Sequence, residues 1–383
     1  MTKHPLKILL LLALLSACSS GTKNGENNRR QITISATKDS SVSDLMEYRF
    51  ISLETSEECL IGHMADVQMH ANRIFVLDSH KSSALFVFDQ NGRFLTKVGT
   101  KGNGPGEYNH PQSFVIDLRT RSIVINDNNK KQLLYYDLDN YKHKYTKELP
   151  GYFQDMSILK NGKIALYSSA AIDQGDRSMN CLQICDSLLN PETTCFDVGF
   201  KSDYSFTLGG RNIYHVGERS FVFHNQIPTV YEIVDGGVKP YMDISFDAFS
   251  YPTIDYLKKE SQGNKDYFLS LFQSGFISSY SIYESQELIC TMFSRDMRQL
   301  YYGIYNKSND KSYLYTREEF VRLFGSGLYV FFHSATEDLI IASVNPSFMG
   351  KPFSPHADLQ VILNGFSPDD NPILCLMKSA GSN

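Results

Sequence analysis

The chain has 383 residues, of which 42% are hydrophobic and 21% charged, so it can bury a sizeable core and wholesale disorder is excluded. Its formal net charge of −5, with Lys and Arg scattered along the chain, leaves no basic stripe that a nucleic-acid backbone could follow. The 23 Tyr and 25 Phe residues favour β-structure, and the length suits either two average domains or one large all-β domain.

The N-terminus has the pattern of a lipoprotein signal peptide, which we assign to residues 1–17. Lys3 and Lys7 precede an apolar run too short to span a bilayer but of the length of a signal-peptide core. The run leads into LSAC, ending at Cys18, which resembles the bacterial lipobox; the resemblance implies cleavage before Cys18 and lipidation of that cysteine. Two or three acyl chains would hold the protein firmly on a membrane. The alternative is an ordinary signal peptide with a chance cysteine.

Residues 18–44 are predicted to form a flexible tether, because the segment is polar, contains glycine and lacks apolar periodicity at its start. No later stretch has the length and apolar character of a membrane span. No Asp follows Cys18 to signal inner-membrane retention, and the segment is a poor match to a surface-export signal. We therefore expect a cell-envelope protein anchored in the outer membrane and facing the periplasm, with surface exposure as the alternative.

The sequence after the N-terminal segment contains a repeated unit. Residues 73–99 and 121–145 share one plan, in which an apolar strand ends in Asp, a polar turn follows, and a second strand ends in Asp. Weaker copies follow at 162–170 with 179–190, and at 219–237, 287–310 and 327–344. Six units of three or four short strands are typical of a β-propeller, whose sheets bury both faces by stacking around an axis. The sequence therefore predicts an all-β, six-bladed propeller with four-stranded antiparallel blades.

The two ends of this domain, which we place at residues 45–380, are predicted to close the ring. The strand pattern at 47–55 precedes the first unit and another at 371–378 ends the chain, so both would complete the sixth blade. One segment, 251–276, breaks the β-pattern, and its Pro and spaced apolar residues indicate a short helical insertion between the fourth and fifth units.

The loop GNGPGEYNHP, residues 102–111, would link the outer strand of the first blade to the innermost strand of the second. Its glycines tolerate positive φ and Pro105 suits a turn, so we interpret it first as a crossover between blades. A phosphate-binding loop is the rival interpretation, but the P-loop lysine, its Ser or Thr, and the strand-to-helix context are all missing.

Several of these motifs together resemble a known family. The segments 49–62, 85–108 and 370–378 contain SLET, then FDQNGRF with GNGPGEY, then DNPILCLMK. They resemble the six-bladed β-propeller lipoproteins of Bacteroidetes, which are similar to NHL-repeat propellers. The resemblance covers roughly residues 45–380 and implies the fold, an envelope location and a binding role. It carries no agreed activity, so no catalytic residue is transferred.

The cysteines besides Cys18 are irregularly spaced and form no disulfide framework. Cys181 and Cys185 point to the same face of a predicted strand but lie about 13 Å apart at the usual strand rise, too far for one bridge. No CxxC or HxxxH motif accompanies them, so we expect buried thiols, no metal site and no cofactor. Whether Cys181, Cys185 and Cys195 take part in other disulfides is left open.

Polar residues of the predicted inter-blade loops are the candidate ligand-binding residues. Tyr108, at the apex of the glycine-rich loop, would offer an exposed aromatic ring to a glycan. Asp78 and Asp127 are interpreted instead as turn formers that satisfy local backbone donors, and no catalytic residue is predicted. The ligand-binding candidates are His80, Glu107, Tyr108, His110, Arg211 and His224.

These features predict a lipid-anchored propeller that binds or scaffolds an envelope protein or a small ligand, such as a glycan or peptide, at the propeller face. One alternative is a hydrolase or lyase acting on a glycan or peptide at the channel mouth, which requires acidic and histidine side chains within hydrogen-bond reach in one pocket. Another is a structural lipoprotein whose flat face packs on an outer-membrane transporter or sensor. The fold alone does not distinguish them.

Overall fold

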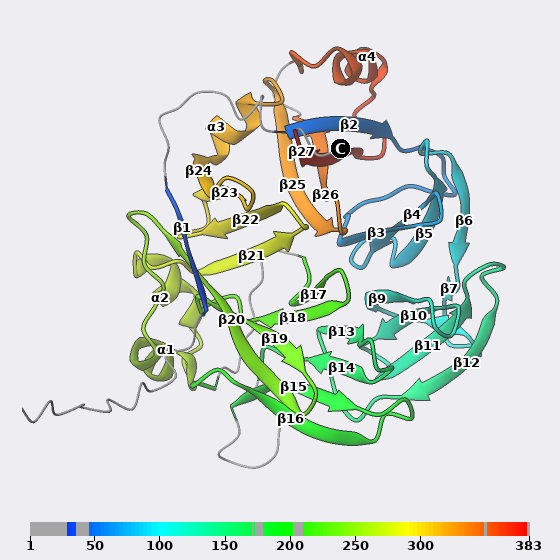
Figure 1. The fold of residues 1–383 in the computed structure, drawn as a ribbon. Coiled ribbons are helices and arrows are strands. Elements are labelled where there is room, and N and C mark those ends of the chain that lie inside the picture. Colours follow the sequence, from blue (N-terminus) through cyan, green and yellow to red (C-terminus); the bar gives the residue numbers. More distant parts are fainter. Residues whose placement is uncertain are drawn as a thin grey trace, which may run out of the picture.

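The computed structural model describes residues 29–35, 46–170, 172, 179–201, 210–347 and 351–380. Six antiparallel sheets surround a central axis, as Figure 1 shows, and each contains four blade strands. The predicted six-bladed propeller is therefore confirmed. The predicted signal peptide and Cys18 lie outside the described residues.

The first three blades follow each other along the chain, with the innermost strand first. They consist of β3 (Asp66–His70), β4 (Arg73–Asp78), β5 (Ala84–Asp89) and β6 (Phe94–Val98); β9 (Pro111–Asp117), β10 (Ser122–Asp127), β11 (Gln132–Asp137) and β12 (His143–Glu148); and β13 (Asp155–Ile158), β14 (Ile164–Tyr167), β15 (Asn180–Cys185) and β16 (Pro191–Asp197).

The last three blades follow the same order. They consist of β17 (Ile213–Val216), β18 (Arg219–Phe223), β19 (Thr229–Val234) and β20 (Gly237–Phe246); β21 (Ser279–Glu284), β22 (Leu288–Ser294), β23 (Leu300–Asn306) and β24 (Lys311–Thr316); and β25 (Leu328–Ala335), β26 (Ile340–Pro346), β27 (Ile373–Ser379) and β2 (Met46–Ser52).

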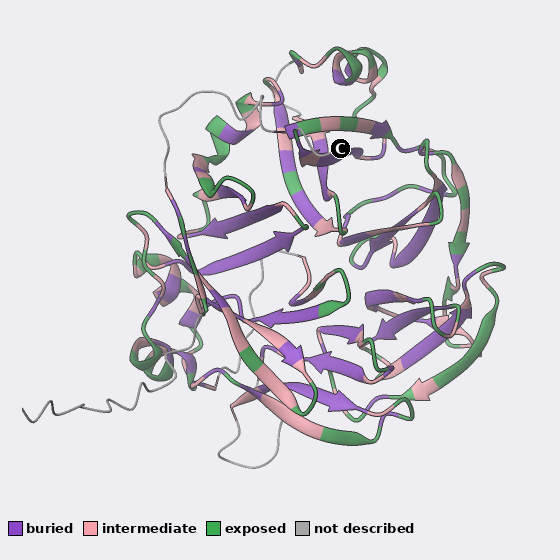
Figure 2. Ribbon diagram, viewed as in Figure 1, coloured by how far each residue is buried: buried purple, intermediate pink, exposed green. Residues whose placement is uncertain are grey.

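The strands are apolar along their whole length because both faces of each blade are covered. In β4, Ile74 and Val76 belong to the core shared with blade 6, whereas Phe75 and Leu77 belong to the core shared with blade 2. Figure 2 shows this burial through the middle strands of the blades. A strand with two buried faces loses the alternation of apolar and polar residues, as the sequence of β4 does.

The ring closes as the sequence predicts. β2, from the start of the domain, pairs antiparallel with β27 at its end, and Phe50 lies opposite Cys375. Blade 6 therefore takes its outer strand from the N-terminal side and its three inner strands from the C-terminal side. This closure joins the two ends of the domain by backbone hydrogen bonds.

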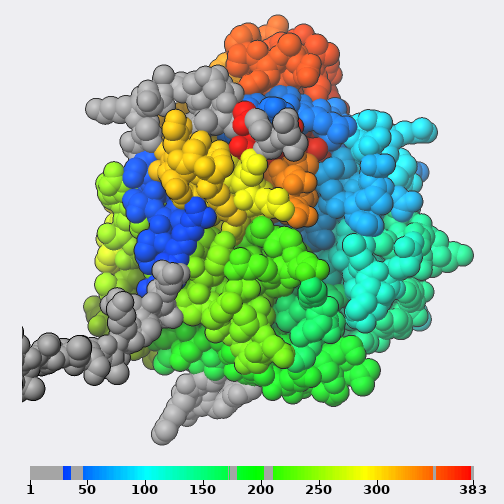
Figure 3. All heavy atoms as spheres, viewed as in Figure 1, coloured from blue at the N-terminus to red at the C-terminus, as the bar shows by residue number. Residues whose placement is uncertain are grey.

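One expectation is corrected at the N-terminus. The predicted flexible tether covers residues 18–44, but Arg30–Ile34 form β1, which pairs parallel with β20 as a fifth strand of blade 4. The physical reason is a short period-2 pattern, in which Ile32 and Ile34 are buried while Gln31 and Thr33 are exposed. A Cβ on Gly303 of blade 5 would lie 3.0 Å from Ile34, so this glycine leaves room for β1. In Figure 3, β1 lies in blue beside blade 5.

The described residues include four short helices outside the blades. α1 (Ile254–Ser261) and α2 (Tyr267–Gln273) lie in the segment for which the sequence predicts a helical insertion. α3 (Arg317–Arg322) and α4 (Ala357–Gly365) are not predicted. Within the described ranges, no helix has the length and apolar character needed to cross a membrane. The six described cysteines are free thiols, and all but the half-buried Cys195 are buried.

Candidate functional site

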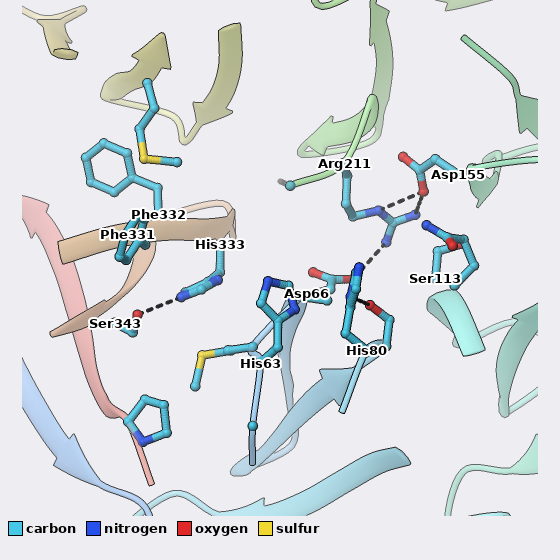
Figure 4. A pocket seen from close by; sticks show the side chains of 18 of the residues that line it. His63, Asp66, His80, Ser113, Asp155, Arg211, Phe331, Phe332, His333 and Ser343 are labelled. Carbon is cyan, nitrogen blue, oxygen red and sulfur yellow. Dashed lines mark hydrogen bonds and ion pairs between the residues drawn. The ribbon is translucent and has the colours of Figure 1, made fainter. Parts of the chain in front are cut away.

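A cavity of about 370 Å³ opens at one end of the propeller axis. All six blades or the loops that lead into them contribute to its wall, which combines carboxylates, amides, hydroxyls and imidazoles with an apolar side from blade 6. We call it the mouth cavity (Figure 4); its lining includes His63, Asp66, His80, Gln112, Asp155, Arg211, Met292, Phe331, His333 and Asn345.

Arg211 crosses the channel at the base of the mouth cavity. It enters from the loop before β17 and forms an ion pair with Asp155 of blade 3, with Nη2 3.0 Å from Oδ1. A longer pair joins its Nη1 to Oδ2 of Asp66 in blade 1, at 3.8 Å. The guanidinium also donates to the carbonyls of Phe114, at 3.0 Å, and Met156. Arg211 therefore ties four neighbouring blades together, and its donors are engaged by the protein.

Two acceptor oxygens in the wall of the mouth cavity are buried without a hydrogen-bond partner among the described residues. They are Oδ1 of Asp66 and Oδ1 of Asn345. Asp66 is only 4% exposed, and burial raises the pKa of its carboxyl despite the opposing effect of Arg211. An unsatisfied buried acceptor is costly, because its hydration has been lost. A donor group that reached either oxygen would supply the missing hydrogen bond.

Imidazoles gather on one side of the cavity. The rings of His63 and His80 meet edge to face with centroids 4.6 Å apart, and His110 follows 6.3 Å from His80. His333 is buried, and loss of hydration lowers its pKa to about 3, so its ring is neutral; its Nε2 lies 2.8 Å from Oγ of Ser343. Within the described part of the chain, no group of His, Cys, Asp and Glu has the geometry of a metal site.

A second cavity, of about 440 Å³, lies further along the inner strands, on the other side of Arg211. Asp66, Arg211 and His333 line both cavities and so form the layer between them. The wall of the second cavity also contains Glu284, which accepts hydrogen bonds from Tyr214 at 2.7 Å, from Tyr241 at 3.0 Å and from Lys307. The channel along the axis is thus divided into two cavities, the mouth cavity and this second one.

Comparison with known proteins places the fold in a family. A family model described as a 6-bladed beta-propeller, DUF5128, matches residues 21–343. The chain belongs to this family. No curated protein sequence matches it significantly.

The solved structures that resemble this chain include two Bacteroides proteins. A Bacteroides fragilis protein named "Putative exported protein" superposes with a TM-score of 0.82 and 26% identity, over 91% of this chain and 99% of the other. A member of the DUF4221 family from Bacteroides vulgatus superposes with a TM-score of 0.57 and 10% identity, over 88% of this chain and 98% of the other. The second likeness concerns the fold alone.

The propeller brings three of the six sequence-predicted ligand residues to the mouth cavity. His80 and Arg211 line it. His110 lies just behind, with its Nε2 3.2 Å from Oε1 of the lining residue Gln112. Of these, Arg211 donates to protein groups, and each histidine has one ring nitrogen in a hydrogen bond, His80 with Ser79 and His110 with Gln112.

Glu107 and Tyr108 support the glycine-rich crossover instead. This loop forms a small parallel pair of β7 (Thr100–Lys101) and β8 (Glu107–Tyr108), and the Glu107 carboxylate accepts from the backbone N–H of Gly104 at 2.7 Å. Tyr108, expected as an exposed aromatic platform, is fully buried and donates to the carbonyl of Val98 at 3.0 Å. The reason is that β8 turns this ring inward, into the core between blades 1 and 2.

His224 is also buried, at 3% exposure, with its ring 5.2 Å from that of Phe200. Burial lowers its pKa to about 4, so it is a neutral core residue. By contrast, sequence reasoning did not select Asp66, Asn345 or His333 as site residues, although all three line the mouth cavity.

The interpretation of Asp78 and Asp127 as turn formers agrees with the hydrogen bonds. Asp78 accepts from five backbone N–H groups, in the segment before β3 and in the β4–β5 turn. Asp127 does the same for blade 2, accepting from Asn109 at 2.7 Å, His110 at 3.2 Å and Lys130 at 3.3 Å. The repeated Asp thus fixes the loops that surround the mouth.

Proposed function

We propose that this protein is an exported binding module that holds a small polar ligand in the mouth cavity. The observation that carries the proposal is the pair of buried, unpartnered acceptor oxygens of Asp66 and Asn345 in a cavity walled by all six blades. Concave sites with a few convergent polar groups and an apolar wall are typical of ligand pockets. A ligand with hydroxyl or amino groups, such as a glycan or a peptide, would supply the donors.

Catalysis is the less favoured alternative. Acidic and histidine side chains do line one cavity, as a hydrolase or lyase would require. However, the Asp66 and Asp155 carboxylates pair with Arg211, and no hydrogen bond in the described part of the chain joins either carboxylate to the His80 or His333 imidazole. This division of partners favours binding over acid–base chemistry.

The first test is a binding screen with small saccharides and short peptides, followed by Asn345→Leu for each hit. Loss of the Asn345 acceptor is expected to weaken binding about tenfold, the cost of one hydrogen bond in a dry site. Asn91→Leu, in an exposed turn of blade 1, is the matched control and is expected to bind as the wild type does. Isothermal calorimetry measures both. Equal affinity of the two variants for every hit would contradict the proposal.

The proposed location is the cell envelope, with a lipid anchor on Cys18. The apolar run followed by LSAC supports it, and so does the name of the Bacteroides fragilis protein, which describes that relative as exported. Periplasm-facing attachment to the outer membrane remains our proposal for this chain, and an envelope protein docking on the same mouth is the form a protein partner would take.

Replacing Cys18 with alanine is expected to abolish incorporation of a labelled fatty acid and to release the protein from the membrane fraction, because the anchor supplies the membrane affinity. Cys195→Ala is the matched control, since Cys195 is the half-buried thiol of the propeller, and it should keep both properties. Metabolic labelling and membrane fractionation provide the readouts. A Cys18→Ala protein that still carries label on the membrane rules out the anchor.

A further inference from the structure

We infer that the ligand of the mouth cavity carries an ammonium group, as an amino sugar or a basic peptide does. The inference rests on the proposed binding function and adds the charge of the ligand to it. Three features of the wall support it: its net charge, the unpartnered oxygen of Asp66 and the exposed ring of Phe331.

The formal charge of the wall is negative with Asp66 ionised, the state that burial disfavours and that a bound cation would favour. Two carboxylates, those of Asp66 and Asp155, line the cavity. Arg211 contributes one guanidinium, and the described lining residues include no lysine. His333 is neutral. The two carboxylates and the one guanidinium of the lining, at their ordinary charges, sum to a formal charge of −1. An anionic ligand would therefore meet repulsion without a free cationic partner, because Arg211 already donates to protein acceptors.

The excess charge is located at Asp66. Arg211 approaches Asp155 to 3.0 Å but Asp66 only to 3.8 Å, so Asp155 is the better compensated carboxylate. Gln68 donates to Oδ2 of Asp66 at 3.0 Å, and Oδ1 has no partner among the described residues. A hydrogen bond from an ammonium to a carboxylate is roughly twice as strong as one between neutral groups. A cationic donor at Oδ1 would satisfy the oxygen and balance the charge at once.

The apolar side of the cavity fits the same ligand. Phe331 is 37% exposed, and it lines the mouth beside the buried Phe332. An aromatic face attracts a cation through its quadrupole and also packs against the C–H face of a sugar or an aliphatic stem. The amide oxygen of Asn345 offers a second acceptor in the same cavity for a hydroxyl or N–H group.

The test compares glucosamine with glucose, and an N-acetylated, C-amidated lysine tripeptide with its blocked norleucine analogue, pairs that differ in the ammonium group; glucuronate serves as the anionic sugar. Calorimetry at pH 7 and low salt should show the amine member of at least one pair binding at least tenfold more tightly than its neutral partner, with glucuronate weakest. The Asp66→Asn variant, which keeps the side-chain shape, should reduce this preference to less than threefold while still binding the neutral member.

Salt provides a second measurement that needs no variant. Raising NaCl from 20 to 500 mM should weaken binding of the amine several-fold more than binding of its neutral partner, because only the former depends on charge. Equal affinity of amine and neutral members overturns the inference and leaves the binding function standing. Failure of every probe to bind the wild type overturns both.

Discussion

Replacing Arg211 with methionine is expected to lower the free energy of unfolding by about 3–5 kcal/mol, because the change leaves buried carboxylates without their partner. Asp155 and Asp66 would keep their burial while losing the ion pairs at 3.0 and 3.8 Å. The carbonyl of Phe114 would lose a donor as well. Urea denaturation followed by circular dichroism measures the loss as a shift of the unfolding midpoint.

Arg219→Met is the matched control. Arg219 pairs with Glu232 on the surface of blade 4 and is 49% exposed, so its removal is expected to cost under about 1 kcal/mol. Removing the charge of the Asp66 carboxylate should partly rescue the Arg211→Met variant. In an Asp66→Asn background, Arg211→Met should lower the free energy of unfolding less than it does alone. Equal losses for Arg211→Met and Arg219→Met would show that Arg211 does not hold the channel together.

The blade architecture could be predicted because it depends on local patterns that recur. Strands such as β4 are apolar on both faces and end in an Asp that fixes the following turn, and these features are visible in one unit without knowledge of the others. β1 was missed because its two isoleucines are a short signal in a polar segment, and its partner β20 lies more than 200 residues away. α3 did leave a local signal, a capping box between Thr316 and Glu319.

The candidate site was harder to predict because it depends on which side chains face the axis. His80, which lines the mouth cavity, was selected from the sequence as a polar residue in a loop after a strand that ends in Asp, and such turns surround the mouth. Asp66 and Asn345 lie at a strand start and near a strand end, where a shift of one residue reverses the facing direction. Tyr108 illustrates the opposite error, since its loop is at the surface while its ring is in the core.

Replacing Asp78 with alanine is expected to cost about 2–4 kcal/mol, since the side chain accepts hydrogen bonds from five backbone N–H groups that would lose their partner. The segment from Gly62 to His63 and the turn containing His80 both line the mouth cavity, so the same variant should weaken ligand binding. Asp89→Ala, in a half-buried turn with two such bonds, is the matched control and should cost clearly less. Equal losses of stability would contradict this role for Asp78.

The contribution of Asp78 should also depend on pH. Burial by itself would raise the pKa of its carboxyl, but the backbone donors, Lys81 and Ser82 among them, outweigh burial and lower it below the ordinary value. The folded state therefore binds a proton less readily than the unfolded state, so this stabilisation is complete above about pH 5 and is lost as the pH falls through the lowered pKa. The difference in unfolding free energy between the wild type and Asp78→Asn should shrink between pH 5 and about pH 2.5. A difference that stays constant over this range would mean that the carboxylate charge does not stabilise these loops.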